Sequence, residues 1–134
     1  MDTALFVCLI EEHPRFLAPV RALFAWAEAG EIDIVTSALT VLEVLVVPLR
    51  AGDHALAARY DALLTRSRGV RVVDLTRDQL RTAARLRAQC GTLRAPDALQ
   101  LAAAVGARCT SFITTDRRMP TPDAVRVLQL SERA

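Results

Sequence analysis

The sequence lacks lysine and asparagine altogether and is poor in cysteine, histidine and aromatic residues. Its seventeen basic residues are therefore all arginines, which the codon usage of a GC-rich genome explains most simply. Cys8, Cys90 and Cys109 are odd in number, form no C-x-x-C pair and, with only two histidines, provide no zinc-ligand spacing. This scarcity excludes a disulfide framework and a zinc domain, and we expect three buried, reduced cysteines in a cytoplasmic protein.

Long hydrophobic runs are also missing from the sequence. The first apolar segment, ALFVCLI, stops at Glu11 and Glu12 and has no basic residue before it, which excludes a usual signal peptide or membrane span. No linker, repeat or low-complexity segment interrupts the 134 residues, and the net charge is only +2. We therefore predict one globular domain over residues 1–134, with no membrane partner.

Apolar periodicity and capping residues divide the chain into alternating helices and strands. Predicted helices cover residues 14–29, 37–47, 53–65, 76–90 and 96–107, and predicted strands cover residues 32–36, 70–75, 110–114 and 125–130. Ser37, Asp53 and Thr76 are the expected N-caps of three helices, the first of which ends near Pro48. This alternation predicts an α/β fold whose central parallel sheet is covered by helices on both faces, with ligands at the carboxyl ends of the strands.

Two acidic residues occupy element boundaries in the C-terminal half. Asp116 directly follows the apolar strand CTSFITT, at the carboxyl end where such sheets bind ligands. An aspartate that bonds its own backbone in a turn is the alternative for this position. Asp97 stands second in a helix behind Pro96, where the helix dipole stabilises a carboxylate whatever the protein does. Neither position by itself decides between structure and function.

Two further acids lie in the N-terminal half. Glu43 falls inside the apolar segment SALTVLEVLVV, where a buried carboxylate needs a partner or a metal ion. Asp2 precedes the apolar run, and a frayed, solvated terminus is its alternative interpretation. Carboxylates brought together repel one another, so a cluster of the four acids would be stable at pH 7 mainly with a cation. Oxygen-only ligands select Mg²⁺ or Mn²⁺.

Four segments follow one another across nearly the whole chain: MDTALFVCLIEEHP, VTSALTVLEVLVVPLRAGD, LRAPDALQLAAA and FITTDRRM. In this order they resemble the motifs of the PIN-domain ribonucleases and, within them, the VapC-type toxins of toxin–antitoxin pairs. In the first, a strand-ending Asp-Thr is followed by an apolar helix and an acid. The resemblance implies a PIN-like three-layer α/β/α domain with a central parallel sheet.

The resemblance also implies a site and an activity. Asp2, Glu43, Asp97 and Asp116 would be the catalytic acids that hold Mg²⁺ or Mn²⁺, with Thr3 and Thr114 or Thr115 as hydroxyl neighbours. The activity would be hydrolysis of RNA phosphodiester bonds by metal-activated water. The implied partners are RNA, a small antitoxin protein and a second copy of the chain. A noncatalytic PIN-like binding module and a housekeeping RNA-processing nuclease remain the alternatives.

Arginines are the expected contacts for RNA phosphates. Arg117 and Arg118 directly follow Asp116, although a solvated turn is an equal alternative. A second set on one helix face, with a plain solvated face as its alternative, is Arg77, Arg81 and Arg85. Aromatic residues make up only 4% of the chain, so reading of bases by stacking is not expected.

Two features of the N-terminal half bear on partners and on the metal site. The segment LEVLVVPLR and the helix with Phe24 and Trp26 offer apolar side chains either to the core or to a partner. Only Met1 precedes Asp2, whereas PIN domains carry several apolar strand residues before this aspartate. A strand with one leading residue is expected to fray and to leave Asp2 mobile. Ala4 stands where relatives often have Asn or Ser.

Overall fold

The computed structural model of the protein describes residues 1–123 and 125–130 and contains helices and parallel strands in alternation. The elements are α1 Thr3–Ile10, α2 Leu17–Glu28, β1 Ile34–Ser37, α3 Leu39–Arg50, α4 His54–Arg66, β2 Val70–Val73, α5 Arg77–Gln89, α6 Ala95–Gly106, β3 Ser111–Thr114 and β4 Arg126–Gln129. The predicted α/β class is thereby confirmed. No helix in the described ranges is long and apolar enough to cross a bilayer.

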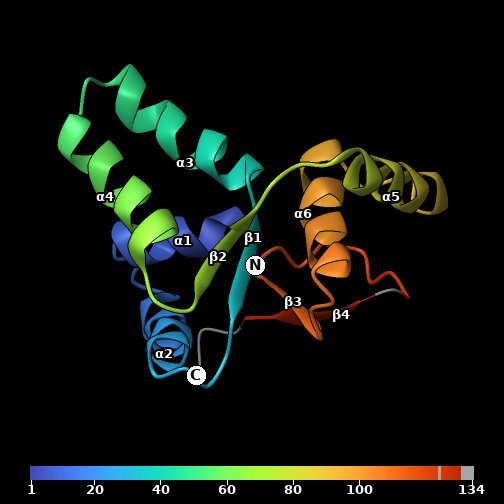
Figure 1. Cartoon of the computed structure of the whole chain (residues 1–134), viewed down its shortest axis with the longest axis horizontal. Helices are drawn as coiled ribbons and strands as arrows, with labels where there is room; N and C mark the ends of the chain where they lie inside the picture. Colours follow the sequence, from blue (N-terminus) through green and yellow to red (C-terminus); the bar gives the residue numbers. More distant parts are fainter. Residues whose placement is uncertain (124, 131–134) are drawn as a thin grey trace.

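The strands pair in parallel as β1 with β2 and β3 with β4. Residues 1 and 2 lie between the two pairs. The amino group of Met1 donates a 2.7 Å hydrogen bond to the carbonyl of Val35 in β1, and the amide of Asp2 donates a 3.1 Å bond to the carbonyl of Ile113 in β3. A short extended segment therefore joins the two strand pairs in the middle of the fold (Figure 1).

Two apolar cores lie on opposite sides of the strands. Helices α1, α2 and α4 lie on one side of β1 and β2, and α5 and α6 on the other (Figure 1). The first core centres on Leu5, Phe6 and Val20, and the second on Leu101 and Phe112, all fully buried. Helices α3 and α4 form a pair that projects beyond the strands (Figure 1). Burial on two sides of one strand layer gives the three-layer arrangement.

Some predicted boundaries and caps are confirmed and others are wrong. Asp53 and Thr76 cap α4 and α5 as predicted. The side chain of each accepts a hydrogen bond from the backbone amide three residues later. Ser37 ends β1 instead of capping a helix, although its hydroxyl accepts from the amide of Leu39. Helix α3 continues past Val47 to Arg50 and contains Pro48, which is buried. Residues 14–16 form turns, so α2 begins later than predicted.

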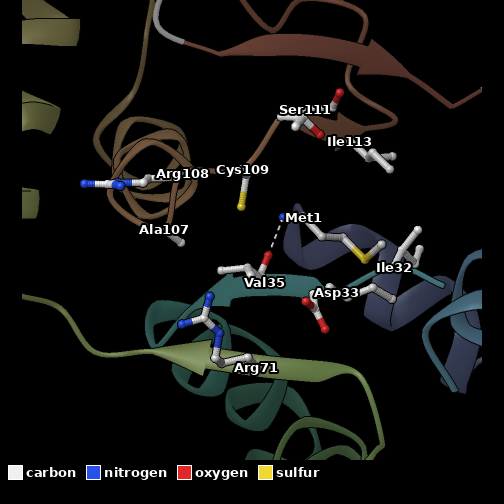
Figure 2. A pocket seen from close by; sticks show the side chains of 12 residues that line it. Met1, Ile32, Asp33, Val35, Arg71, Ala107, Arg108, Cys109, Ser111 and Ile113 are labelled. Atoms are coloured by element: carbon white, nitrogen blue, oxygen red, sulfur yellow. Dashed lines mark hydrogen bonds between the residues drawn. The ribbon is translucent and has the colours of Figure 1, made fainter. Parts of the chain in front are cut away.

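The expectation of a frayed N-terminus is wrong. Met1 is only 8% exposed and packs in the first core. Burial lowers the pKa of its amino group from the ordinary 8.0 to about 6. Figure 2 shows the amine bonded to Val35 beside a cavity of about 320 Å³, which lies between the beginnings of β1 and β3. The burial of Cys8 is confirmed, whereas Cys90 and Cys109 are partly exposed and all three are free.

The buried amine predicts a pH dependence of stability. Its folded pKa lies below its unfolded pKa, so the unfolded chain binds more protons between about pH 6 and 8. The free energy of unfolding should therefore rise with pH across this window, by up to about 3 kcal/mol. Urea denaturation at several pH values measures the slope. A form acetylated at the α-amino group should lose this contribution, and equal slopes for both forms would contradict the prediction.

Gly69, directly before β2, is the glycine of the described structure at which an added Cβ would come closest to a neighbouring atom. Its φ is +78°, and an added Cβ would lie 2.4 Å from the carbonyl oxygen of Ala27 at the end of α2. Gly30 has a similar φ of +81° but open space around it. The pair therefore separates conformational strain from steric overlap.

We predict that Gly69→Ala destabilises the fold more than Gly30→Ala. Both substitutions carry the left-handed penalty of about 1 to 2 kcal/mol. Only Gly69→Ala also forces α2 and β2 apart, which adds about 1 to 3 kcal/mol as overpacking does elsewhere. Urea denaturation of the two variants gives the difference, and equal losses would show that α2 shifts freely.

Candidate metal-binding site

All four predicted acids line one open pocket at the carboxyl ends of β1 and β3. Asp2 precedes α1, Glu43 lies in α3, Asp97 lies in the first turn of α6 and Asp116 follows β3. The pocket has a volume of about 430 Å³ and is completed by Thr3, Ala4, Arg94, Pro96 and Thr115. Acids that are far apart in the sequence thus share one cavity, because the N-terminal parts of α1, α3 and α6 and the carboxyl end of β3 lie around it.

Asp2 is the acid most affected by burial. The hydroxyl of Thr114, which is itself fully buried, donates a 2.8 Å hydrogen bond to its carboxylate. Burial raises the pKa of Asp2, the bond from Thr114 opposes this shift, and the negative charge of Asp97 adds to it. The side chain is therefore a desolvated carboxylate held in place, contrary to the mobile residue expected from the sequence.

The prediction that Glu43 is a buried carboxylate is wrong. Glu43 is exposed, because α3 projects from the body of the fold and even its apolar neighbour Leu42 is 60% exposed. Its carboxylate accepts a 2.8 Å hydrogen bond from the hydroxyl of Thr3. Its place at the pocket therefore depends on this bond rather than on burial.

Asp97 and Asp116 both line the acidic pocket, and each has an arginine beside it. The Asp97 side chain is 18% exposed, and its carboxylate lies 3.4 Å from the guanidinium of Arg94. The Asp116 carboxylate accepts a 2.9 Å bond from the amide of Arg118 and lies 3.6 Å from its guanidinium. The turn interpretation of Asp116 is thus also correct, since its side chain bonds the backbone two residues onward.

The predicted substrate contacts differ in their positions. Thr3 and Thr115 line the acidic pocket, whereas Arg118 lines an adjoining cavity of about 390 Å³ that shares Arg94, Asp97 and Asp116 with it. Arg117 is exposed and lines neither cavity. The second arginine set, on α5, is exposed, and Arg81 pairs with Asp78 at 2.9 Å. This pairing favours the solvated-face interpretation for α5.

Sequence reasoning missed Arg94 and a buried polar cluster under the pocket. Arg94 is the N-cap residue of α6 and lines both cavities. Gln100 and Thr40 are buried and lie one helical turn from Asp97 and Glu43, respectively. Their spacing of three residues from an acid on the same helix is the signal that could have found them.

The pocket provides the ligand chemistry of a hard divalent cation. Carboxylate and hydroxyl oxygens are the donors that Mg²⁺ and Mn²⁺ prefer. A cation would also offset the desolvation and like charge that raise the pKa of Asp2. In this conformation each acid instead contacts a protein group. Within residues 1–123 and 125–130, no three acidic, histidine or cysteine side chains lie close enough together to hold an ion. The donor set fits a metal, and binding would bring these carboxylates closer together.

Comparison with solved structures finds the same fold in toxin–antitoxin proteins. A chain of a toxin–antitoxin complex from Klebsiella pneumoniae is similar with a TM-score of 0.71 and 22% identity, over 96% of this chain and 93% of that chain. A chain of VapBC2 from Rickettsia felis, bound to a DNA fragment from its promoter, has a TM-score of 0.71 and 15% identity, over 96% and 95%. These low identities establish the fold alone.

Comparison at the level of sequence identifies the family. No curated protein gives a significant match. The PIN domain family matches residues 1–125, which include all four acids and nine of the ten elements in full. The chain therefore belongs to the PIN domain family.

Proposed function

We propose that this protein is a metal-dependent ribonuclease that acts as the toxin of a toxin–antitoxin pair in the cytoplasm. PIN domains are nucleases, which supports a hydrolase of phosphodiester bonds. The observation that carries the proposal is the single pocket in which Asp2, Glu43, Asp97 and Asp116 meet from four separate segments. Such a gathering of carboxylates destabilises the metal-free protein and is therefore expected only where it serves a site.

The proposed cofactor is Mg²⁺ or Mn²⁺, in keeping with the general dependence of PIN domains on divalent metals. Asp2, Glu43, Asp97 and Asp116 would hold it. When bound there, a divalent cation lowers the pKa of water and offsets the charge that develops on the phosphate. No histidine lines the described pocket, and the sequence contains no lysine, so the side chains there that can accept a proton are the carboxylates themselves.

The chain's own side chains supply position and charge around this site. Thr114 holds Asp2, and Thr3 holds Glu43, so two of the acids keep their hydroxyl partners while they face the pocket. The Arg94 side chain is 71% exposed and can turn away from Asp97 to contact a phosphate. The Arg118 side chain can turn away from Asp116 in the same way. Guanidinium groups bind phosphate oxygens in pairs, which orients the scissile bond over the carboxylates.

Substitution of Asp97 tests the proposed reaction. Asp97→Asn keeps the shape of the side chain and its place in the first turn of α6 but removes one ligand charge. Loss of a metal ligand should lower cleavage by more than the 10- to 100-fold that is typical for removing an outer partner, so we expect a loss above about 100-fold. Cleavage of single-stranded RNA with Mg²⁺ and with a chelator measures the effect.

Asp78→Asn is the matched control for this substitution. Asp78 also lies in the first turn of a helix, α5, but its side chain is 92% exposed and lines neither the acidic pocket nor the adjoining cavity. It should leave cleavage unchanged. Retained cleavage in Asp97→Asn would refute the site, and absence of metal-dependent cleavage in the unmodified protein would favour the noncatalytic binding module.

Partner proteins are proposed from the apolar surface of α3. Leu42, Val47 and Leu49 are 60%, 67% and 52% exposed on this projecting helix, an unusual gathering for a surface helix. Solved neighbours that are toxin–antitoxin complexes support a small antitoxin as one partner. We propose that α3 and α4 also form the contact between two copies of the chain.

The dimer contact predicts a change of oligomeric state. Val47→Arg places a charge in the centre of the proposed contact and should convert a dimer into a monomer, because an unpaired charge is unfavourable at a desolvated interface. Leu80→Arg on α5, where Leu80 is 51% exposed, is the control and should remain dimeric. Light scattering after size-exclusion chromatography distinguishes them. A monomeric parent protein would show that these side chains serve another contact.

A further inference from the structure

A cluster of buried polar side chains lies directly beneath the acidic pocket. Thr36 in β1, Thr40 in α3 and Gln100 in α6 are 1%, 0% and 3% exposed. Buried hydroxyl and amide groups destabilise a fold unless they are hydrogen-bonded, and here every one of them is bonded to another. The cluster therefore joins three elements, each of which leads to the acidic site.

The amide of Gln100 has one orientation in this cluster. Its Oε1 atom lies 3.3 Å from the backbone nitrogen of Ser37, a group that can only donate. The oxygen of the amide must therefore face β1. Its Nε2 atom then faces the other way and donates to the hydroxyls of Thr40 at 2.8 Å and Thr3 at 3.2 Å.

Giving each proton to the shorter of its possible contacts sets the direction of the remaining bonds. Each threonine hydroxyl has one proton to donate. Thr3, which accepts from Gln100, donates its proton to Glu43 at 2.8 Å. Thr40 donates to its nearest hydroxyl, that of Thr36, at 2.7 Å, and Thr36 donates to the carbonyl of Met1 at 3.0 Å. The 3.0 Å contact between Thr3 and Thr40 and the 3.4 Å contact between Thr36 and the Oε1 atom of Gln100 are the longer ones and receive no proton of their own.

Two chains of hydrogen bonds thus begin at Gln100 and end at the acidic pocket. One passes through Thr3 to the carboxylate of Glu43. The other passes through two threonines to the carbonyl of Met1, whose peptide bond leads to Asp2. Glu43 is exposed and has no burial to fix it, so the donated proton from Thr3 is what holds its carboxylate toward the pocket.

We propose that Gln100 is a positioning residue for the metal site: it sets the direction of the threonine protons and thereby holds Glu43 and the backbone at Asp2 in place. The proposal deepens the proposed function and rests on it for the identity of the metal. It assigns no contact between Gln100 and the metal or the RNA. A buried glutamine that only fills space and satisfies its own polar groups is the competing explanation.

The test uses Gln100→Met, which keeps the length of the side chain and removes both donors. Gln79→Met on α5 is the control, since Gln79 is also a helical glutamine, although only partly buried, and it lies against Gly106 at the end of α6 away from the pocket. Calorimetric titration with Mn²⁺, without RNA, should show affinity about 10- to 100-fold weaker in Gln100→Met, as for other supporting partners of metal ligands, and unchanged affinity in Gln79→Met. Weakened stability with unaltered Mn²⁺ affinity would overturn the proposal.

A double-mutant cycle with Glu43→Gln tests whether Gln100 acts through Glu43. If it does, Glu43→Gln weakens Mn²⁺ binding in the parent but has little further effect in Gln100→Met. Full additivity of the two losses would contradict the relay through Thr3. If Gln100→Met does not fold, Thr3→Val removes the relay at the pocket, and Thr3→Ser should restore Mn²⁺ affinity because it keeps the hydroxyl.

These measurements separate the inference from the proposed function. Mn²⁺ binding that depends on Gln100, without any cleavage of RNA, would refute the ribonuclease and leave the positioning role standing. If cleavage needs Mn²⁺ but Gln100→Met changes neither the Mn²⁺ affinity nor the turnover, the positioning role is refuted and the ribonuclease stands. A parent protein that binds no Mn²⁺ would overturn both.

Discussion

The rest of the fold depends on a two-residue segment held between β1 and β3. Met1 donates a backbone hydrogen bond to β1, and Asp2 donates one to β3. The segment thereby connects two strand pairs that have separate apolar cores. The same segment supplies the carboxylate of Asp2 to the acidic pocket. Structural continuity and the proposed chemistry therefore depend on the same few atoms, and a disturbance of either strand pair reaches the site directly.

The acidic pocket is a source of instability in the metal-free protein. Because burial raises the folded pKa of Asp2 above its unfolded value, ionising this group on the way to neutral pH favours the unfolded chain. The bond from Thr114 reduces this effect, and the charge of Asp97 increases it. A cation bound by the carboxylates would reverse the balance, so the metal would stabilise the fold as well as act on the substrate. The cation would thus be both cofactor and structural ligand.

Local features were predictable from the sequence, whereas long-range ones were not. The cap at Asp53 depends on atoms three residues away, and this prediction is confirmed. Parallel strands and covering helices follow from periodicity, and the four acids could be grouped because each stands at an element end or on a helix. The exposure of Glu43 could not be foreseen, since it depends on α3 projecting past the strands (Figure 1). The bond between Gln100 and Thr3 spans 97 positions, and no local pattern specifies such a contact.

The bond between Asp2 and Thr114 also has a consequence for the order in which the acidic pocket is assembled during synthesis. Asp2 is made first, but its hydroxyl partner Thr114 lies 112 positions later. A growing chain that has reached only α5 already contains Glu43 but has no β3 against which to seat Asp2. The acidic pocket can therefore be assembled only after β3 has been made. Until then the carboxylate of Asp2 lacks the hydroxyl that holds it, so the site is incomplete while the residues before β3 are being synthesised.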